Sequence, residues 1–271
     1  MSSVILTLLT NTETAPTLLA AASRFSALLG DVRLEVMVVR IAPMSTIMPT
    51  EEILSKEAEN RIRTEEHARA DRIHHLFDQW ASTVHTKIVP TWVDEEGDVV
   101  ELVKKWGERS DYIVVGRPEA HANHGAHAAV HAAIFSTDRP VLIVPANSKP
   151  EFGKIVAVAW RDDRFTMRAV LAALRCLPEA TRIHVFMGYR EGQTVPKLPE
   201  ALTEHEADVI SHPLVIGKEP FGAQLLAEAH AIKADMLVMG AFVHSAWHDM
   251  LFGGVTKHIL SHADLPVMVR H

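Results

Sequence analysis

The residues best suited to chemistry stand near the end of the chain, where two glycines open a helical pattern. Gly253 and Gly254 precede Val255, Thr256 and further apolar residues at helical spacing, so they lie at the start of a predicted helix. Upstream, a short apolar run predicts a buried strand that ends at Gly240. N–H groups at a helix start have no partner within the helix, and they bind anions where glycines let a ligand approach. The order of strand, glycine loop and helix therefore predicts an anion-binding site.

No group of residues in the sequence predicts catalysis. There is no Ser-His-Asp set at a recognisable turn, no P-loop lysine motif and no paired acid motif. We therefore assign no catalytic residue and expect binding without turnover.

The most conspicuous cluster elsewhere consists of histidines at positions 121, 124, 127 and 131. His124, His127 and His131 can share one helical face with the spacing of metal ligands. No cysteine or carboxylate is interleaved among them, and the segment is rich in alanine. We therefore expect a solvated helix face and no metal site.

Charge and cysteine content narrow the function classes. The 271 residues carry a formal net charge of -7, and the sequence pI is about 6.2, so we expect no nucleic-acid partner. Cys176 is the only cysteine, which favours the reducing cytoplasm and excludes a disulfide framework. The apolar N-terminus lacks the basic start of a signal peptide, and no apolar run has the ~20 residues of a transmembrane span. We expect a cytoplasmic protein without a membrane partner.

An internal repeat supplies the elements that must position the glycines. The segment SDYIVVG, ending at Gly116, matches ADMLVMG, ending at Gly240, at an offset of 240 − 116 = 124. Earlier, RLEVMVVR from Arg33 matches RIHVFMGY from Arg182, at an offset of 182 − 33 = 149. The second copy is therefore about 25 residues shorter between its second and third strands. The extra segment, Thr50–Ser82, is charged and predicts a long helix that the second copy mostly lacks.

Apolar runs alternate with helical patterns in both copies. Strands are predicted at Val4–Leu8, Leu34–Val39, Val84–Pro90, Tyr112–Val115 and Val141–Val144, and again at Ile155–Trp160, Arg182–Met187, Val209–Leu214, Met236–Met239 and Val267–Val269. Helices between them include Ala15–Leu29, Val99–Arg109, Thr166–Leu177 and Gly222–Ile232. This order predicts an α/β protein of two tandem, doubly wound domains, 1–147 and 151–271, each with a parallel five-stranded sheet, the second shorter. Ligands of such sheets bind at the carboxyl ends of the strands, which puts Trp160 and Gly240 on one rim.

With these motifs in place, the sequence resembles the universal stress protein family. The segment from Gly240 through GGVT to HADLPVMV resembles the family's C-terminal motif, and AWRDDRFTMRAVLAAL from Ala159 resembles the first strand and helix of its tandem members. The resemblance covers both copies and is stronger in the second. It implies an adenine nucleotide α-hydrolase-like fold and a stress-response or regulatory function linked to ATP or another adenine nucleotide.

The family's ATP-binding motif is partly kept in the second copy. Gly240 and Gly253 match its outer glycines, whereas Val243 replaces the middle glycine and Gly254 the hydroxyl residue. In the first copy Gly116 is kept, but no Gly-Gly or Gly-Ser pair follows it. We therefore expect adenine nucleotide in the second domain only. The candidate nucleotide-binding residues are Trp160, Gly240, His244, Ser245, Gly253, Gly254, Val255 and Thr256.

Several readings of these residues stay open. The glycines can simply relieve tight packing between strand and helix, and Trp160 can be a core residue instead of a wall for adenine. At the level of function, the alternatives are a nucleotide-free interaction or scaffold protein and, less favoured, an enzyme of the adenine nucleotide α-hydrolase-like group.

The last strand of each copy is an apolar edge preceded by proline. Because an uncovered edge invites pairing, we expect Val141–Val144 to pair with Val267–Val269 and join the two domains as a pseudo-dimer. A homo-oligomer of the whole chain is compatible with this pairing.

Overall fold

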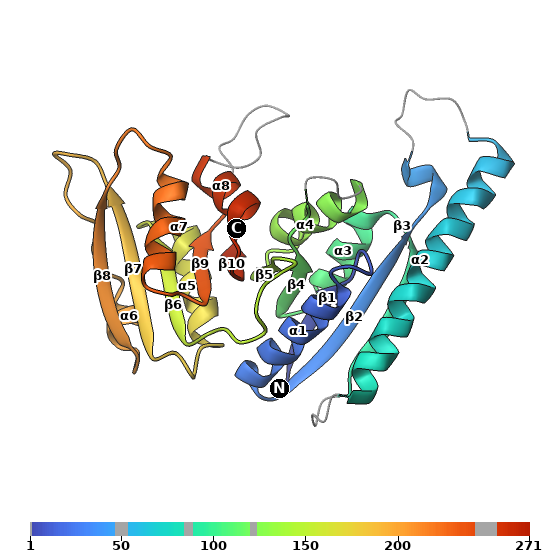
Figure 1. The fold of residues 1–271 in the computed structure, drawn as a ribbon, viewed down its shortest axis with the longest axis horizontal. Coiled ribbons are helices and arrows are strands. Elements are labelled where there is room, and N and C mark those ends of the chain that lie inside the picture. Colours follow the sequence, from blue (N-terminus) through green and yellow to red (C-terminus); the bar gives the residue numbers. More distant parts are fainter. Residues whose placement is uncertain (1, 47–53, 84–88, 120–123, 242–253) are drawn as a thin grey trace.

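Ten strands form one continuous sheet with helices on both faces (Figure 1). The computed structural model describes residues 2–46, 54–83, 89–119, 124–241 and 254–271. The first half contains β1 (Ser3–Leu8), α1 (Ala15–Leu29), β2 (Val32–Ile41), the 3-10 turn η1 (Pro43–Thr46), α2 (Lys56–Thr83), β3 (Thr91–Gly97), α3 (Val99–Gly107), β4 (Tyr112–Gly116), α4 (His124–Ser136) and β5 (Val141–Val144). The second contains β6 (Ile155–Trp160), α5 (Arg164–Leu174), β7 (Arg182–Tyr189), α6 (Glu200–Thr203), β8 (Asp208–Val215), α7 (Phe221–Ala231), β9 (Met236–Gly240), α8 (Gly254–His262) and β10 (Val267–Arg270).

The strand order repeats in the two halves. The sheet runs β3-β2-β1-β4-β5-β10-β9-β6-β7-β8, and every neighbouring pair is parallel except β5 with β10. Each half is thus a doubly wound five-stranded sheet, which confirms the predicted fold class. Whether residues 1–147 and 151–271 fold as separate domains stays a prediction.

The central pair of strands joins the halves as the sequence predicted. β5 and β10 pair antiparallel, with Val141 opposite Val269 and Ile143 opposite Val267. Figure 1 shows both strands in the middle of the sheet, where the first half meets the second. The two apolar edges cover each other, so the pairing removes the exposed edge that each half would otherwise present.

Two apolar layers run through both halves, one on each face of the sheet. Side chains of α1, α2 and α5 pack on one face, and those of α3, α4, α7 and α8 pack on the other. Alternate residues of a strand point to opposite faces, so strands covered on both sides are apolar throughout. The fully buried β9 run, Met236–Gly240, is an example.

One predicted strand is misplaced. The third strand is β3, Thr91–Gly97, whereas the sequence predicted Val84–Pro90; residues 84–88 lie outside the described residues, and Val89 is 84% exposed. β3 forms an edge of the sheet, and only Val93 in it is buried. Its Asp94, Glu95 and Glu96 face solvent or ion partners, so it has no apolar run to detect.

The extra segment of the first half is a single long helix. α2 covers 28 residues and buries only Ala70, Ile73 and Phe77. Between β7 and β8 the second half has only the four-residue α6, which confirms the predicted difference in length. Within the described residues no helix is long and apolar enough to cross a membrane.

Candidate functional site

The second half has a cavity at the carboxyl ends of its central strands. Its volume is about 200 Å³. It is lined by Ala159 and Trp160 of β6 and Arg161 after it, Phe186 and Gly188 of β7, Ile216 after β8, Phe221 and Leu225 of α7, Met239 and Gly240 of β9, Thr166 of α5, and Val255 and Thr256 of α8. The cavity lies where ligands of doubly wound sheets bind. Its walls are mostly apolar, and among these described lining residues Arg161 is the only ionisable one.

Two helices begin beside this cavity. Asp163 caps α5 by accepting hydrogen bonds at Oδ1 from the N–H groups of Phe165 (2.9 Å) and Thr166 (3.0 Å). Helix α8 begins at Gly254, and its first-turn residue Thr256 is 2% exposed. The positive ends of two helix dipoles therefore lie near the same space and favour a negative charge there.

Gly240 permits a close approach between β9 and α5. A Cβ at this position would lie 2.7 Å from the backbone nitrogen and 2.8 Å from Oγ1 of Thr166. Thr166 is 1% exposed, and its Oγ1 has no hydrogen-bond partner in the described structure. Gly240 thus has the packing role that we left open, and beside it a buried hydroxyl at the cavity wall lacks a partner, which a polar ligand could supply.

Trp160 does not offer its ring to this cavity. Trp160 is 4% exposed and packs in the layer formed by α5, whereas the cavity opens in the layer of α7 and α8. Its Nε1 donates a hydrogen bond to the carbonyl of Lys197 (2.9 Å). The two faces alternate along β6, so the side chain of Ala159 points to the layer of α7 and α8 and that of Trp160 to the layer of α5. The indole is therefore a core residue.

The structure brings together part of the predicted site. Gly240, Val255 and Thr256 line the cavity, and Gly254 starts α8 with no atom of the described residues within 4 Å of where its Cβ would be. His244, Ser245 and Gly253 lie outside the described residues. Asp163, the carboxylate that stands just before α5, is occupied, because it caps α5 and also pairs with Arg161 at 3.2 Å.

Sequence reasoning missed the apolar walls of the cavity. Phe186 and Gly188 come from β7 and Phe221 and Leu225 from α7, and each has an ordinary core or turn pattern. Gly188 alone gave a signal, because a glycine interrupts the end of an apolar strand. A Cβ there would lie 2.5 Å from the Phe221 ring, so the glycine makes room for that ring.

The apolar part of the corresponding position in the first half is nearly closed, whereas a separate, more polar cavity of about 280 Å³ remains beside Gly116 and the start of α1. The cavity at the ends of β1 and β2 measures about 20 Å³, roughly the space of one water molecule. Leu8 pairs with Val115 in the first half as Ala159 pairs with Met239 in the second, so a leucine replaces an alanine. By the same register, Val39 stands where the second half has Gly188.

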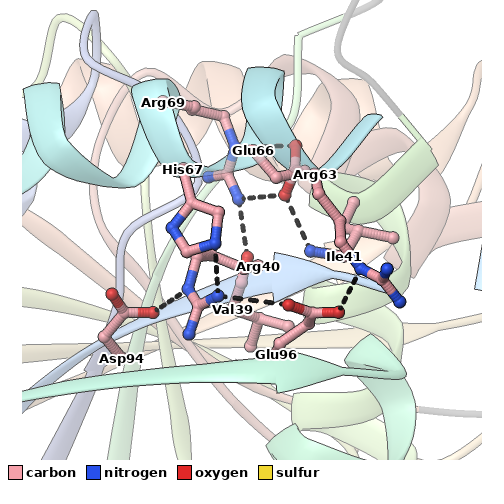
Figure 2. A network of polar contacts seen from close by, with 9 residues as sticks. All are labelled: Val39, Arg40, Ile41, Arg63, Glu66, His67, Arg69, Asp94 and Glu96. Atoms are coloured by element: carbon pink, nitrogen blue, oxygen red, sulfur yellow. Dashed lines mark hydrogen bonds and ion pairs between the residues drawn. The ribbon is translucent and has the colours of Figure 1, made fainter. Parts of the chain in front are cut away.

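A buried ion pair from α2 completes the closure (Figure 2). Arg69 donates to the strand-end carbonyls of Thr10 (2.9 Å) and Val39 (2.6 Å), and it forms two hydrogen bonds to Glu66 (2.7 and 3.1 Å). Glu66 in turn accepts from the N–H of Ile41 (2.7 Å). The two side chains are only 15% and 16% exposed. Helix α2 thus supplies hydrogen-bond partners to backbone groups near the ends of β1 and β2. At the equivalent edge of the second half, the cavity leaves this space open to a ligand.

An outer shell of charge fixes α2 over β2 and β3. Arg40 contacts Asp94 (2.6 Å) and Glu96 (3.2 Å), and Arg63 of α2 contacts Glu96 (3.2 Å). His67 of α2 lies 3.2 Å from Arg40 (Figure 2). This network holds the Arg69–Glu66 pair in place.

The histidine cluster is partly described. His124 begins α4, and His127 and His131 line a cavity of about 290 Å³ near α8; His121 lies outside the described residues. Burial lowers the pKa of His131, whose Nε2 has no partner in the described structure. No group of three or more His, Cys, Asp or Glu in the described ranges is arranged to hold a metal. The absence of a metal stays a prediction.

Comparison with known proteins agrees with the fold. The model of the universal stress protein family matches residues 142–271. The whole chain is similar in structure to a universal stress protein from Archaeoglobus fulgidus DSM 4304, with a TM-score of 0.71, 17% identity, and coverage of 98% of this chain and 97% of that one. A candidate universal stress protein from Pseudomonas aeruginosa UCBPP-PA14 gives a TM-score of 0.55, 13% identity, and coverage of 99% and 93%. No curated protein matches the sequence.

Proposed function

We propose, from the premise that this chain belongs to the universal stress protein family through residues 142–271, that its second half binds an adenine nucleotide. The observation that carries the proposal is the difference between the two matched cavities. The cavity of the second half measures about 200 Å³, and its counterpart in the first half about 20 Å³. Side chains of the first half fill the apolar part of its own position. The cavity of about 280 Å³ that remains there beside Gly116 has Glu13 and Glu119 and no aromatic side chain among its described lining residues, so we place the proposed ligand in the second half only.

The walls of the second cavity suit a base. Phe186, Phe221, Leu225 and Met239 supply aromatic and apolar surface, and a planar ring buried against such surface gains from the hydrophobic effect and from stacking. The Thr166 hydroxyl, which has no partner in the described structure, is available to a polar edge of the base or to the ribose. Cavities with apolar walls and few polar groups are typical of cofactor sites.

The start of α8 suits the phosphates. No atom of the described residues lies within 4 Å of where a Cβ of Gly254 would be, so among them nothing keeps phosphate oxygens from the N–H groups of the first turn, where the helix dipole favours negative charge. Val243 replaces a glycine of the family motif, so we propose a weaker hold on the terminal phosphates and similar affinities for AMP, ADP and ATP.

We further propose that bound nucleotide is held and not hydrolysed. Arg161 is the one ionisable side chain among the described lining residues, and general acid–base catalysis needs a positioned group that exchanges a proton near neutral pH. The role that follows is a stress-response or regulatory module that senses adenine nucleotide.

Two substitutions test the site. Ala159→Leu puts into the second cavity the side chain that fills the first, and Gly254→Asp places a negative charge before the phosphates. Asp is favourable in the first turn of a helix, so the second variant is expected to fold. Calorimetry with ATP, ADP and AMP should show saturable binding to the wild type and a loss of at least about tenfold in affinity, on the order of 1.4 kcal/mol, in each variant.

The matched control is Leu8→Ala in the first half, which should leave nucleotide affinity unchanged. An absence of nucleotide binding in the wild type would favour the nucleotide-free interaction protein. Binding that survives both substitutions would show that the ligand sits elsewhere, and release of ADP from ATP would favour the enzyme.

A further inference from the structure

A second, polar cavity lies at the seam between the halves, on the side of the sheet where the strands of the first half begin. Its volume is about 390 Å³. The first half contributes Ser3, Leu29, Asp111, Tyr112, Arg139 and Pro140, and the second contributes Arg168, Leu171, Ala172, Arg175 and Arg270. Four arginines line this one space, although the whole chain has a net charge of -7. We call it the arginine cavity.

The fold explains why the four arginines meet. Arg168 and Leu171 lie on α5, and Arg175 is the C-cap residue just after it; with spacings of three and four residues, all three lie on one side of the helix. Arg270 ends β10, and because β10 runs antiparallel to β5, this end lies beside the start of β5. Arg139 stands just before that start. The pairing of the two halves therefore builds the cavity.

Most of this positive charge has no carboxylate partner. Arg168 pairs with Asp138 at 2.5 Å. Arg139 donates to the carbonyl of Glu108 (2.6 Å) and Arg270 to that of Asp138 (3.4 Å), and the Nε atom of each is buried without a partner among the described residues. In the described parts of the chain, none of Arg139, Arg175 and Arg270 forms an ion pair. Buried donors of this kind normally have acceptors.

The acidic groups nearby are already engaged. Asp111, the one acid among the lining residues, accepts a hydrogen bond from the N–H of Val4 (2.8 Å). Burial lowers the pKa of Arg270, and the nearby charges of Arg168 and Arg139 lower it further while Asp138 opposes them, which agrees with guanidinium groups that crowd one space. An anion that entered the cavity would relieve this repulsion.

The equivalent place across the pseudo-symmetry lacks this charge. At the offset of 126 between the matched last strands, Arg139 corresponds to Leu265 and Arg270 to Val144, because 265 − 139 = 126 and 270 − 144 = 126. Both counterparts are buried and apolar. The arginine cavity is thus present at only one of the two pseudo-symmetric ends of the β5–β10 pair. Packing of the two halves against each other therefore does not by itself require these arginines.

We propose that the arginine cavity binds a phosphate-bearing small anion that contacts both halves of the chain. Guanidinium groups present paired donors that match phosphate oxygens, and several of them converging from different elements suit a ligand with more than one phosphoryl group. The site is separate from the proposed nucleotide pocket: it is built from the first strands' starts, α5 and the end of β10.

Calorimetry with sodium pyrophosphate at low salt tests the proposal. The wild type should bind it saturably and more tightly than orthophosphate. Arg175→Gln should weaken binding by on the order of tenfold, since it removes one charged contact. Arg175 is exposed and forms no ion pair, so the variant should fold. Leu171→Glu, at a 44% exposed lining residue, should weaken binding without the loss of any arginine. Arg190→Gln, an exposed arginine in the loop after β7, is the control and should change nothing.

Three results would overturn the proposal: no saturable binding, equal losses in Arg175→Gln and Arg190→Gln, or succinate binding as tightly as pyrophosphate. Gly254→Asp separates this site from the nucleotide pocket. Pyrophosphate binding that is lost in Gly254→Asp and kept in Arg175→Gln would assign the anion to α8 and would also count against the arginine cavity.

Discussion

The two halves share one strand order but differ at the carboxyl ends of their strands. In the first half, Leu8, Val39 and the Arg69–Glu66 pair fill the apolar part of this space, where about 20 Å³ remains, and the open cavity is a more polar one beside Gly116. In the second half, Ala159 and Gly188 stand at the equivalent positions, and about 200 Å³ remains. A doubly wound sheet leaves polar strand ends at this edge in every copy. The comparison shows that the chain can satisfy them with its own side chains or leave them for a ligand.

The largest effect is expected from breaking the closure of the first half. Arg69→Met removes four hydrogen bonds and leaves Glu66, which is 16% exposed, without its cation. Loss of one partner of a mostly buried pair should lower the free energy of unfolding by about 3 kcal/mol. Denaturant unfolding measures this change.

Arg161→Met is the matched variant at the same edge of the second half. Arg161 is 61% exposed and pairs with Asp163, so its loss should cost below about 1 kcal/mol. Similar costs for the two variants would contradict the view that the first half depends on an internal cation. In Arg69→Met combined with Glu66→Gln, the total should be smaller than the sum of the single changes, because the two residues interact.

An intermediate effect is expected at the matched glycines. A Cβ at Gly240 would lie 2.7 Å from the backbone nitrogen of Thr166, which cannot move without shifting α5. A Cβ at Gly116 would lie 3.3 Å from the end of the Leu18 side chain, which can turn away. Gly240→Ala should therefore destabilise by about 2 kcal/mol and Gly116→Ala by less than about 1 kcal/mol. Thermal unfolding of both variants checks the difference. A cost at Gly116 as large as that at Gly240 would show that the halves are packed alike.

Much of the fold could be predicted from the sequence because its apolar runs are bounded by clear signals. The bounds of α1, β5 and β6 are as predicted, since glycine, proline or a capping group stands at their ends. β3 was misplaced because pairing with β2, and not its own composition, makes it a strand. Intrinsic β-strand propensity says little about a charged strand at the edge of a sheet.

The site was less predictable, for reasons that particular residues show. The direction of the Trp160 ring depends on which face of β6 meets α5, and one added residue would reverse it. Arg69 looked like one more solvated charge of a polar helix. Its bond to Thr10 spans 59 positions, so no local pattern reveals it. The closure of the first cavity therefore required the three-dimensional structure.

The smallest effect on stability is expected from acidification. It concerns a matched position in the second strand of each half, where the second half has a histidine and the first a glutamate. His184 lies opposite Ala157 in β6, as Glu35 lies opposite Leu6 in β1. His184 is 7% exposed, and its Nδ1 lies 2.8 Å from Nε2 of His212. Burial lowers the pKa of His184 below the usual 6.5, and the neighbouring His212 and Arg182 lower it further, while Asp208 opposes them.

The sign of the pH effect follows from this lowered pKa. In the unfolded chain His184 takes up a proton near its usual pKa, whereas in the folded chain it does so only at lower pH, so the unfolded state binds more protons in between. The stability that neutral His184 contributes is full above about pH 6.5 and is lost as the pH falls below it. Because the side chain keeps some access to water, the loss should stay below about 1 kcal/mol. Between about pH 7.5 and 5.5, thermal unfolding should show a smaller decrease in Tm for His184→Gln than for the wild type. The control is His75→Gln, at an exposed position of α2, which should behave as the wild type. An unchanged pH profile in His184→Gln would show that the acid sensitivity of the second half arises from other groups.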